Sequence, residues 1–298
     1  MTRGCFIVVT NKNSAWVTLL LGSSLLLSAC GQSSAPAASG SAQKETAAKP
    51  AEAVPAADVQ KEAIEKYRQY VIGQTDEFVK AADAFTKAVK AGDIETAKSL
   101  YAPSRMHFER IEPIAESLGD FDPWIDAREG DVPDNEWRGY HRLEKALWET
   151  KSVAGQDKVA DQLLQDVKQL RVKVESVEID TAMLVTGAVE LLNEVSSSKV
   201  TGEEERYSHT DLYDFAANVE GAHEIYQVLK PAVENKDAAL AGEINSRFKE
   251  LDQALQPYRK DKGYVSYTEL TPEQTKKLSQ AVDALAEPLS KMGTVIGG

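Results

Sequence analysis

The chain has 298 residues and a net charge of −13, with 34 lysine and arginine residues against 47 aspartate and glutamate residues. That length can form one large core or two smaller ones, and a hydrophobic content of 42% excludes a wholly disordered chain. The acidic balance argues against a nucleic-acid binder, because a phosphate backbone is held by clustered lysine and arginine, and it favours a cationic partner such as a metal ion.

The first thirty residues are predicted to be an export signal. Arg3 and Lys12 provide a positively charged start, and residues 15–27 form an apolar stretch. This stretch is shorter than the roughly 20 residues of a transmembrane helix, but it fits the core of a signal peptide. It ends in Leu-Ser-Ala-Cys, which resembles a bacterial lipobox, so we expect residues 1–29 to be removed and Cys30 to be lipidated. The alternative is an ordinary signal peptide in which Cys30 is incidental.

Residues 30–57 are predicted to be the lipidated cysteine and a flexible tether. Small and polar residues predominate there, and they cannot bury enough apolar surface to offset the loss of chain entropy. Such a tether reaches roughly 30 Å from the membrane. A lipid anchor at Cys30 would place the rest of the chain in the periplasm or, in a Gram-positive bacterium, on the cell surface.

From Asp58 onward, apolar residues recur at helical spacing and strand patterns are nearly absent. A stripe on the first helix, which Gly92 caps, comprises Ala63, Tyr67, Tyr70, Val71, Phe78, Ala82, Phe85 and Val89. We expect a second helix from Asp93 to Pro103 and a third over residues 106–118.

An irregular acidic stretch over residues 119–135 separates these helices from the next one, over residues 136–150. Further helices are expected over residues 157–200 (one helix or a pair), 210–235, 236–262 and 271–292, with residues 263–268 as a loop. The sequence therefore predicts an all-α fold for residues 58–298. It would be an antiparallel bundle of about seven or eight helices, in one domain or two joined bundles.

The motifs of zinc peptidases, serine hydrolases and nucleotide-binding enzymes are absent from the sequence. His223-Glu224 begins a zinc-peptidase pattern, but Gln227 stands where the second histidine is needed, and an amide does not replace an imidazole as a zinc ligand. Both cysteines lie within the first thirty residues, so the helical part has no thiolate for catalysis or metal binding.

Carboxylates and a few histidines are the remaining candidates for a functional site. His141 and Glu144 are three residues apart, on one helical face, and Glu109 and Glu112 have the same spacing. Pro113 follows at once, and its missing N–H frees the carbonyl of Glu109, so the helix should kink or restart there. Carboxylates with one imidazole suit iron, manganese or zinc. Such pairs are also common on the solvated faces of acidic helices, so spacing alone leaves both interpretations open.

Four segments together resemble the signature segments of the EfeO/EfeM family, periplasmic iron-uptake proteins with an imelysin-like (peptidase-like) domain. They are residues 101–116, 139–149, 191–222 and 263–271, and the resemblance extends from Asp58 to the C-terminus. EfeO-type members also carry an N-terminal cupredoxin domain. Only the tether precedes the helices here, so the chain resembles the short EfeM form, which lacks the copper site.

The resemblance implies a lipoprotein that captures ferrous or ferric iron and passes it to an EfeU-type permease, with an EfeB-type haem peroxidase as a third partner. The bound ion would be Fe2+ or Fe3+, with zinc or another divalent metal as a further option. On this interpretation the chain is not an enzyme. The family's HxxE motif matches His141 and Glu144, and its further acidic ligands match Glu109, Glu112, Asp126 and Glu205. Protonation of such carboxylates would weaken binding as the pH falls through about 4–5.

Two other functions remain open from the sequence. One is a lipoprotein that binds an acidic polysaccharide, bridged by a metal ion, or another ligand in a groove rich in tyrosine and tryptophan. The acidic charge makes such a polyanion electrostatically unfavourable without the bridging ion. The other is an imelysin-type metallopeptidase, in which His141 and Glu144 would hold a catalytic metal, although the sequence offers no separate general base.

Overall fold

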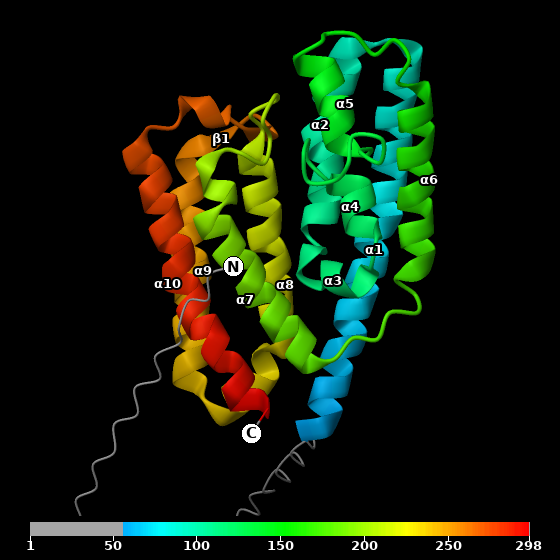
Figure 1. The fold of residues 1–298 in the computed structure, drawn as a ribbon. Coiled ribbons are helices and arrows are strands. Elements are labelled where there is room, and N and C mark those ends of the chain that lie inside the picture. The colour runs from blue at the N-terminus through cyan, green and yellow to red at the C-terminus, as the bar shows by residue number, and fades with distance from the viewer. Residues whose placement is uncertain (1–55, 298) are drawn as a thin grey trace, which may run out of the picture. The chain divides into compact units, whose positions relative to one another are not determined.

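Helices make up nearly all of the regular structure in residues 56–297, which are the residues that this computed structural model describes (Figure 1). The all-α prediction is confirmed. The predicted signal peptide, Cys30 and nearly all of the tether lie outside those residues. Within the described range, no helix combines the length and apolar character needed to cross a membrane.

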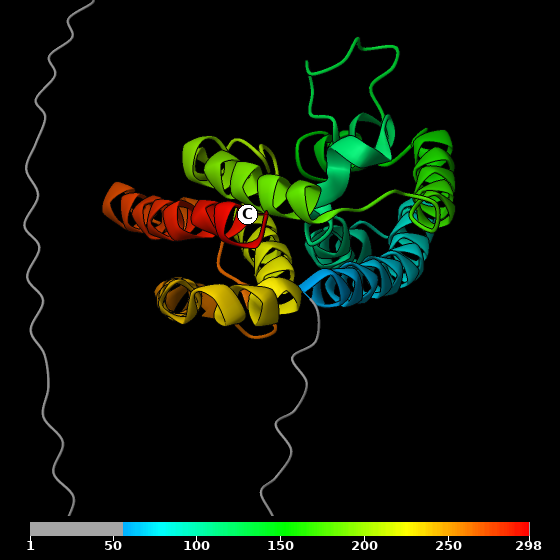
Figure 2. The same ribbon diagram turned by 90° about the horizontal axis from the view of Figure 1, so that it is seen from below.

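The N-terminal helices pack around α1 (Figures 1 and 2). The long α1 lies against α2 and α6, and short helices and α5 close the group. Its helices are α1 (Ala56–Ala91), α2 (Ile94–Glu109), α3 (Ala115–Leu118), α4 (Phe121–Asp126), α5 (Tyr140–Trp148) and α6 (Asp157–Lys173).

The C-terminal helices form a second group, in which α10 packs against α7 and α9 (Figure 1). They are α7 (Thr181–Ser197), α8 (Asp211–Lys236), α9 (Ala238–Leu255) and α10 (Pro272–Gly297). The region 157–200 is thus a pair of helices, and the side chain of Asp180 caps the second by accepting from the Met183 amide. Helix α8 joins the groups because it also packs against α1 and α2.

The hydrophobic pattern of α1 predicted its buried face correctly. Of the predicted stripe, only Tyr70 is half-buried, and the other members lie in the core. Gly92 ends the helix with a φ of 73°, a conformation that costs glycine little, and the Asp93 carboxylate accepts from the Thr96 amide at the start of α2.

Several predicted boundaries were wrong. Helix α2 continues through Pro103, because the carbonyl that loses its partner belongs to Ser99, which is exposed and can bond to water. The acidic stretch contains α4, a short helix of six residues. Helix α9 ends at Leu255, and the residues taken for a helix end and a loop form a small antiparallel hairpin. Its strands are β1 (Arg259–Lys260) and β2 (Gly263–Tyr264).

The two groups meet at the segment that follows α2, where a 3-10 helix spans Glu112–Ile114 with Pro113 inside it. Two glycines let neighbouring backbones approach this segment. A Cβ on Gly187 of α7 would collide with the carbonyl of Pro113, and a Cβ on Gly221 of α8 would collide with the carbonyl of Arg110. The helix groups can approach this closely because Gly187 and Gly221 have no side chains.

Gly221→Ala is expected to lower the free energy of unfolding by about 1–3 kcal/mol, since the added methyl group must push two helices apart. The matched control is Gly242→Ala, because Gly242 is exposed on α9 with nothing near its Cβ position. That control should stabilise the chain by about 0.5–1 kcal/mol through helix propensity. Urea unfolding followed by circular dichroism measures both, and equal effects would contradict the close approach.

Candidate metal centre

His141 lies at the centre of a buried group of carboxylates where α2, α4, α5 and the turns before α8 meet. Its Nδ1 is 3.1 Å from Oε2 of Glu144, one turn further along α5. Its Nε2 is 3.6 Å from Oδ1 of Asp126 and 3.9 Å from Oε1 of Glu204. All four side chains are at most 8% exposed, so charge in this group is poorly screened by water.

Gly139 explains how α4 and α5 bring Asp126 to His141. It precedes α5 with a φ of 89°, and a Cβ there would collide with the backbone carbonyls of Trp124 and Ile125. Only glycine allows α5 to begin this close to the end of α4. The Trp137 indole also donates to the carbonyl of Ala127 at 2.8 Å, which fixes the chain just after Asp126.

Glu144 orients the imidazole. Its Oε1 accepts from the backbone amides of Tyr207 and Ser208 at 2.9 and 2.7 Å, and its Oε2 lies against Nδ1 of His141. Burial alone raises the pKa of Glu144, but His141 and these two amides outweigh it, so the pKa is lowered. Both oxygens are thus committed, and the ring is held with Nε2 pointing toward Asp126 and Glu204.

Arg105 is a buried cation that links four acidic side chains. Its guanidinium lies 2.6 Å from Glu109 and 2.7 Å from Glu205, contacts Asp126, and is 3.4 Å from Asp214. The Arg105 side chain is 1% exposed. A charge so deeply buried is stable only when it is paired, and these carboxylates supply the pairing.

Glu109 and Glu112 lie in an adjoining group around Lys199. The Lys199 ammonium is 3.1 Å from Oε2 of Glu109 and 2.8 Å from Oε2 of Glu112. Burial raises the pKa of Glu109, but attraction to Lys199 and Arg105 outweighs it and lowers the pKa to about 2. Asn218 donates to both carboxylates and to the carbonyl of Glu109, which Pro113 leaves free as predicted.

The six predicted site residues therefore divide into two groups. The structure brings Asp126, His141, Glu144 and Glu205 together, whereas Glu109 and Glu112 bind Lys199. Glu109 is linked to the first group through Arg105. Their role as metal ligands stays a prediction.

The sequence did not reveal that Arg105 and Lys199 lie between the acidic side chains. Of the three consecutive glutamates at positions 203–205, only Glu205 was predicted to belong to the site. Arg105 stands four residues before Glu109, a spacing that signals an ion pair on a helix. Glu204 differs from Glu205 only by its position in an irregular turn, and nothing in the sequence distinguishes the two. Asp214 carried no signal, yet it is buried and neither carboxylate oxygen has a hydrogen-bond partner among the described residues.

Protons reside in this site when no ion is bound. Burial and repulsion by Arg105 lower the pKa of His141, but the bond to Glu144 and the charges of Asp126 and Glu205 outweigh them and raise it to about 9. Burial is also the largest cause that raises the pKa of Glu205 to about 8, with Glu144 adding to it. At neutral pH His141 therefore holds a proton, which a cation bound at its Nε2 would displace.

Two sets of atoms could hold a metal ion, each with its members within 4.8 Å of one another. One set comes from Asp126, His141 and Glu204, and the other from His141, Glu144 and Glu205. The first set fits better, because Nε2 of His141 has no hydrogen-bond partner among the residues described, whereas both oxygens of Glu144 are already bonded. One imidazole with two carboxylates suits iron(II), manganese(II) or zinc(II), with water completing the coordination.

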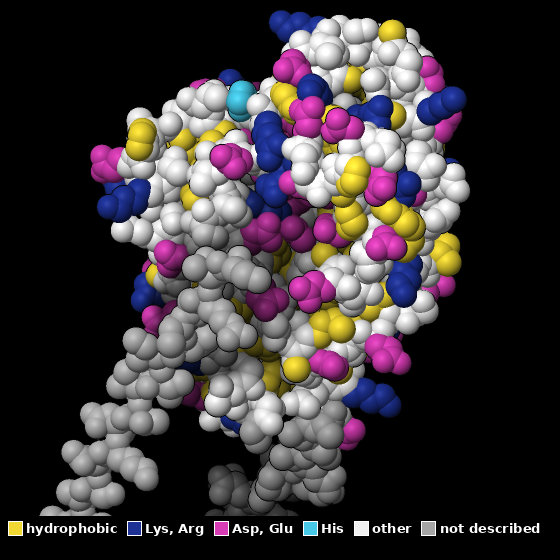
Figure 3. Space-filling view, in the orientation of Figure 1, with side chains coloured by type: hydrophobic (Ala, Val, Ile, Leu, Met, Phe, Trp, Pro, Cys, Tyr) yellow, Lys and Arg dark blue, Asp and Glu magenta, His cyan; other side chains and the backbone are white. Residues whose placement is uncertain are grey.

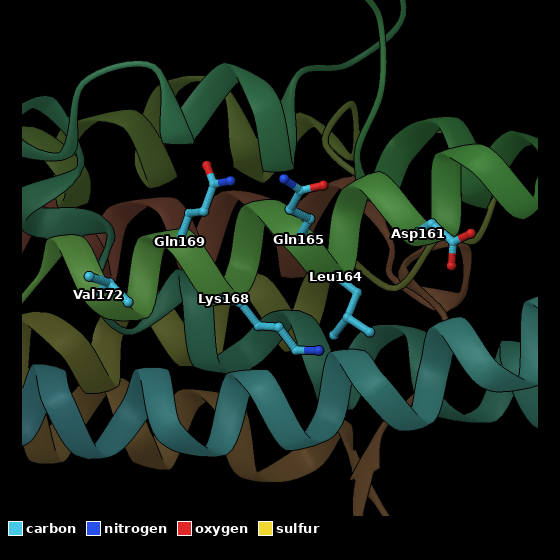
Figure 4. Close-up of a pocket in the computed structure, with 6 residues that line it drawn as sticks. All are labelled: Asp161, Leu164, Gln165, Lys168, Gln169 and Val172. Atoms are coloured by element: carbon cyan, nitrogen blue, oxygen red, sulfur yellow. The ribbon is translucent and has the colours of Figure 1, made fainter.

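A hollow along α6 is a poorer candidate (Figure 4). One helix lines it, and Figure 4 shows its side chains pointing in different directions along that helix. They are Asp161, Leu164, Gln165, Lys168, Gln169 and Val172. A single carboxylate beside a lysine does not form a metal site, so this hollow offers no alternative to the group around His141.

Comparison with known proteins identifies similar chains over most of the length of this one. Residues 63–292 match the family model described as imelysin, or peptidase M75. The chain is 44% identical over 283 residues to an Efem/EfeO family lipoprotein of Staphylococcus haemolyticus, which covers 93% of this chain and 98% of that protein. It is 46% identical over 241 residues to an Efem/EfeO family lipoprotein of Staphylococcus aureus strain NCTC 8325, which covers 79% and 85%.

Proposed function

This chain belongs to the EfeM/EfeO family of lipoproteins with an imelysin domain, and from that premise we propose that it captures iron ions outside the cytoplasm and delivers them to an EfeU-type permease. An EfeB-type peroxidase would be the third component. The lipoprotein names of the relatives support a membrane-anchored location, with Cys30 as the proposed anchor.

One observation carries the proposal: the buried Nε2 of His141 has no hydrogen-bond partner within residues 56–297, and it faces the carboxylates of Asp126 and Glu204. In the proposed complex these three groups bind the ion. Glu144 holds the ring in place, as partners of metal-bound histidines commonly do. In the ion-free protein, Arg105 and Arg128 neutralise Asp126 and Glu204, which keeps the ligands close together.

Isothermal titration of the helical domain with iron(II), under anaerobic conditions, tests the proposal. Micromolar or tighter binding supports iron capture, and its loss in Glu204→Gln supports the assigned ligand set. An absence of binding would move the function to an organic ligand.

The proposed site also predicts a pH dependence that differs from the one expected from the sequence. Iron(II) binds the neutral imidazole, and the pKa of His141 is about 9, so each ion bound at pH 7 should release a proton. The affinity should rise up to about tenfold per pH unit until pH 9, well above the range of 4–5 that free carboxylates suggest.

Calorimetry at pH 7 in two buffers of different ionisation enthalpy measures this release. A binding heat that does not depend on the buffer would show that His141 is already neutral or does not bind the ion.

The arrangement does not favour a peptidase. Glu144, the carboxylate three residues after the proposed ligand, is bonded to the imidazole and to two backbone amides, so it orients the ring and is not placed as a separate general base. We expect no peptide cleavage by the metal-loaded protein.

A further inference from the structure

Arg128 separates the buried group around His141 from the solvent. Its Nη1 donates to Oε2 of Glu204 at 3.0 Å, and the other oxygen of Glu204 lies 3.9 Å from Nε2 of His141. On the outer side, Nε of Arg128 donates to Oδ2 of Asp131 at 3.1 Å. The exposed fractions of these side chains rise outward, from 2% for His141 and 5% for Glu204 to 27% for Arg128 and 40% for Asp131. The contacts therefore lead from the imidazole to the surface.

The other side chains that make polar contacts with the three proposed ligands are fully covered. Arg105 contacts Asp126, and the imidazole lies 3.1 Å from Glu144 and 3.5 Å from the hydroxyl of Tyr101. These neighbours are at most 1% exposed. Within the described part of the chain, Arg128 is thus the one polar neighbour of the proposed ligands that reaches the surface. An ion that enters from this side must pass it.

The loop that carries Arg128 is held in place by its next residue. Both oxygens of Glu129 accept from the Lys145 ammonium, at 2.6 and 2.7 Å, and the hydroxyl of Tyr207 donates to the same carboxylate. Arg206 donates to the carbonyl of Glu129 at 2.8 Å. Figure 3 shows basic and acidic side chains side by side at the surface between the two helix groups. Because the backbone is tied on both sides, the Arg128 side chain is the part that can move most easily.

We propose that Arg128 is a gate, which rotates away from Glu204 to admit an ion and returns to it once the ion is bound. Asp131 holds the guanidinium while the gate is open, since it already bonds to Nε. Arginine suits this role because its planar fork can bond to two carboxylates at once. After the ion has bound, the restored bond to the outer oxygen of Glu204 would keep it inside. The gate rests on the proposed function, because it concerns the ion that binds at His141.

Removing the guanidinium should let a bound ion escape. In Arg128→Gln, Mn2+, used as an air-stable substitute for iron(II), is expected to leave at least about fivefold faster than in the wild type. The electrostatic effect alone has the opposite sign, because the loss of a nearby positive charge holds a bound cation more tightly. The direction of the change in the exit rate therefore distinguishes a gate from a charge. Stopped-flow mixing of Mn2+-loaded protein with a chelator, followed by tryptophan fluorescence, measures this rate.

Two further variants complete the kinetic test. Arg128→Lys keeps the charge but lacks the fork that bonds to both carboxylates, so its exit rate should lie between those of the wild type and Arg128→Gln. Arg247→Gln is the matched control, because it removes an equal charge on the exposed face of α9 and should change the rate by at most about twofold. Circular dichroism verifies the fold of each variant. Slower or unchanged exit from Arg128→Gln would overturn the gate.

Hydrogen exchange in the ion-free protein tests the gate separately from iron capture. The hydrogen on Cε1 of His141 exchanges with deuterium only when water reaches the ring, so Arg128→Gln should raise its exchange rate at least about fivefold, as measured by mass spectrometry. His223, half-buried on α8, should exchange at an unchanged rate. Equal exchange at His141 in both proteins would overturn the gate. Faster exchange in a protein that binds neither Mn2+ nor iron(II) would support the gate and contradict the proposed function.

Discussion

His141→Ala is expected to weaken iron(II) binding by at least a hundredfold. The variant loses the only imidazole of the ligand set and also the group that Glu144 holds in place. Titration calorimetry against the wild type measures the loss. His107→Ala is the control, because His107 is half-buried on α2, bonds to Gln74 and lies outside the carboxylate group, so its affinity should stay within about twofold.

Two further variants distinguish a ligand from a residue that orients one. Glu204→Gln removes a proposed ligand, whereas Glu144→Gln removes only the partner of Nδ1, which typically costs 10–100-fold in affinity. A larger loss at Glu144 than at Glu204 would show that the ion binds through Nδ1 and that the alternative set, with Glu205, is correct.

Arg105→Met is expected to lower the free energy of unfolding by about 3–5 kcal/mol at neutral pH. It leaves four buried carboxylates facing one another without their shared cation. Without the arginine, the charged form of these buried carboxylates is destabilised, so their folded-state pKa values rise above the unfolded values. The unfolded chain then holds fewer protons than the folded one, and stability falls as the pH rises.

The loss should therefore be smaller at pH 5 than at pH 8, as measured by urea unfolding at both values. Arg247→Met is the control, since Arg247 pairs with Glu250 on the exposed face of α9 and should cost at most about 1 kcal/mol. Excess Mn2+ should stabilise Arg105→Met more than the wild type, because a bound ion can replace the missing charge. A loss independent of pH would show that Arg105 acts through packing alone.

The sequence predicted those parts of the fold that depend on local spacing. The stripe on α1, the caps at Gly92 and Asp93 and the free carbonyl before Pro113 each follow from residues within one or two helical turns. The helix end predicted at Pro103 was wrong, because the sequence alone does not show that Ser99 is exposed and that its carbonyl can bond to water. The hairpin at β1 and β2 is too short to leave a strand pattern.

The site could be predicted only in part, because most of its contacts join residues that are far apart in the chain. Spacing identified His141 and Glu144 as a pair on one face, but their partners come from helices far apart in the chain. Lys199 meets Glu109 across 90 residues, and no local pattern reveals that a lysine fills the space between two glutamates. The family resemblance supplied the acidic residues, and the packing of α2 against α8 decided which of them Arg105 and Lys199 neutralise.

The glycine joint between the helix groups would also matter for ion release in the proposed function. Asp126 and His141 belong to the N-terminal group, whereas Glu204 lies in the turn that follows α7, in the C-terminal group. Coordinate bonds are about 2 Å long, so a rotation that separates the halves by one or two ångströms removes a ligand without any change in pH. If the chain delivers its ion to a permease as proposed, a permease that binds both helix groups would release the ion by moving them apart.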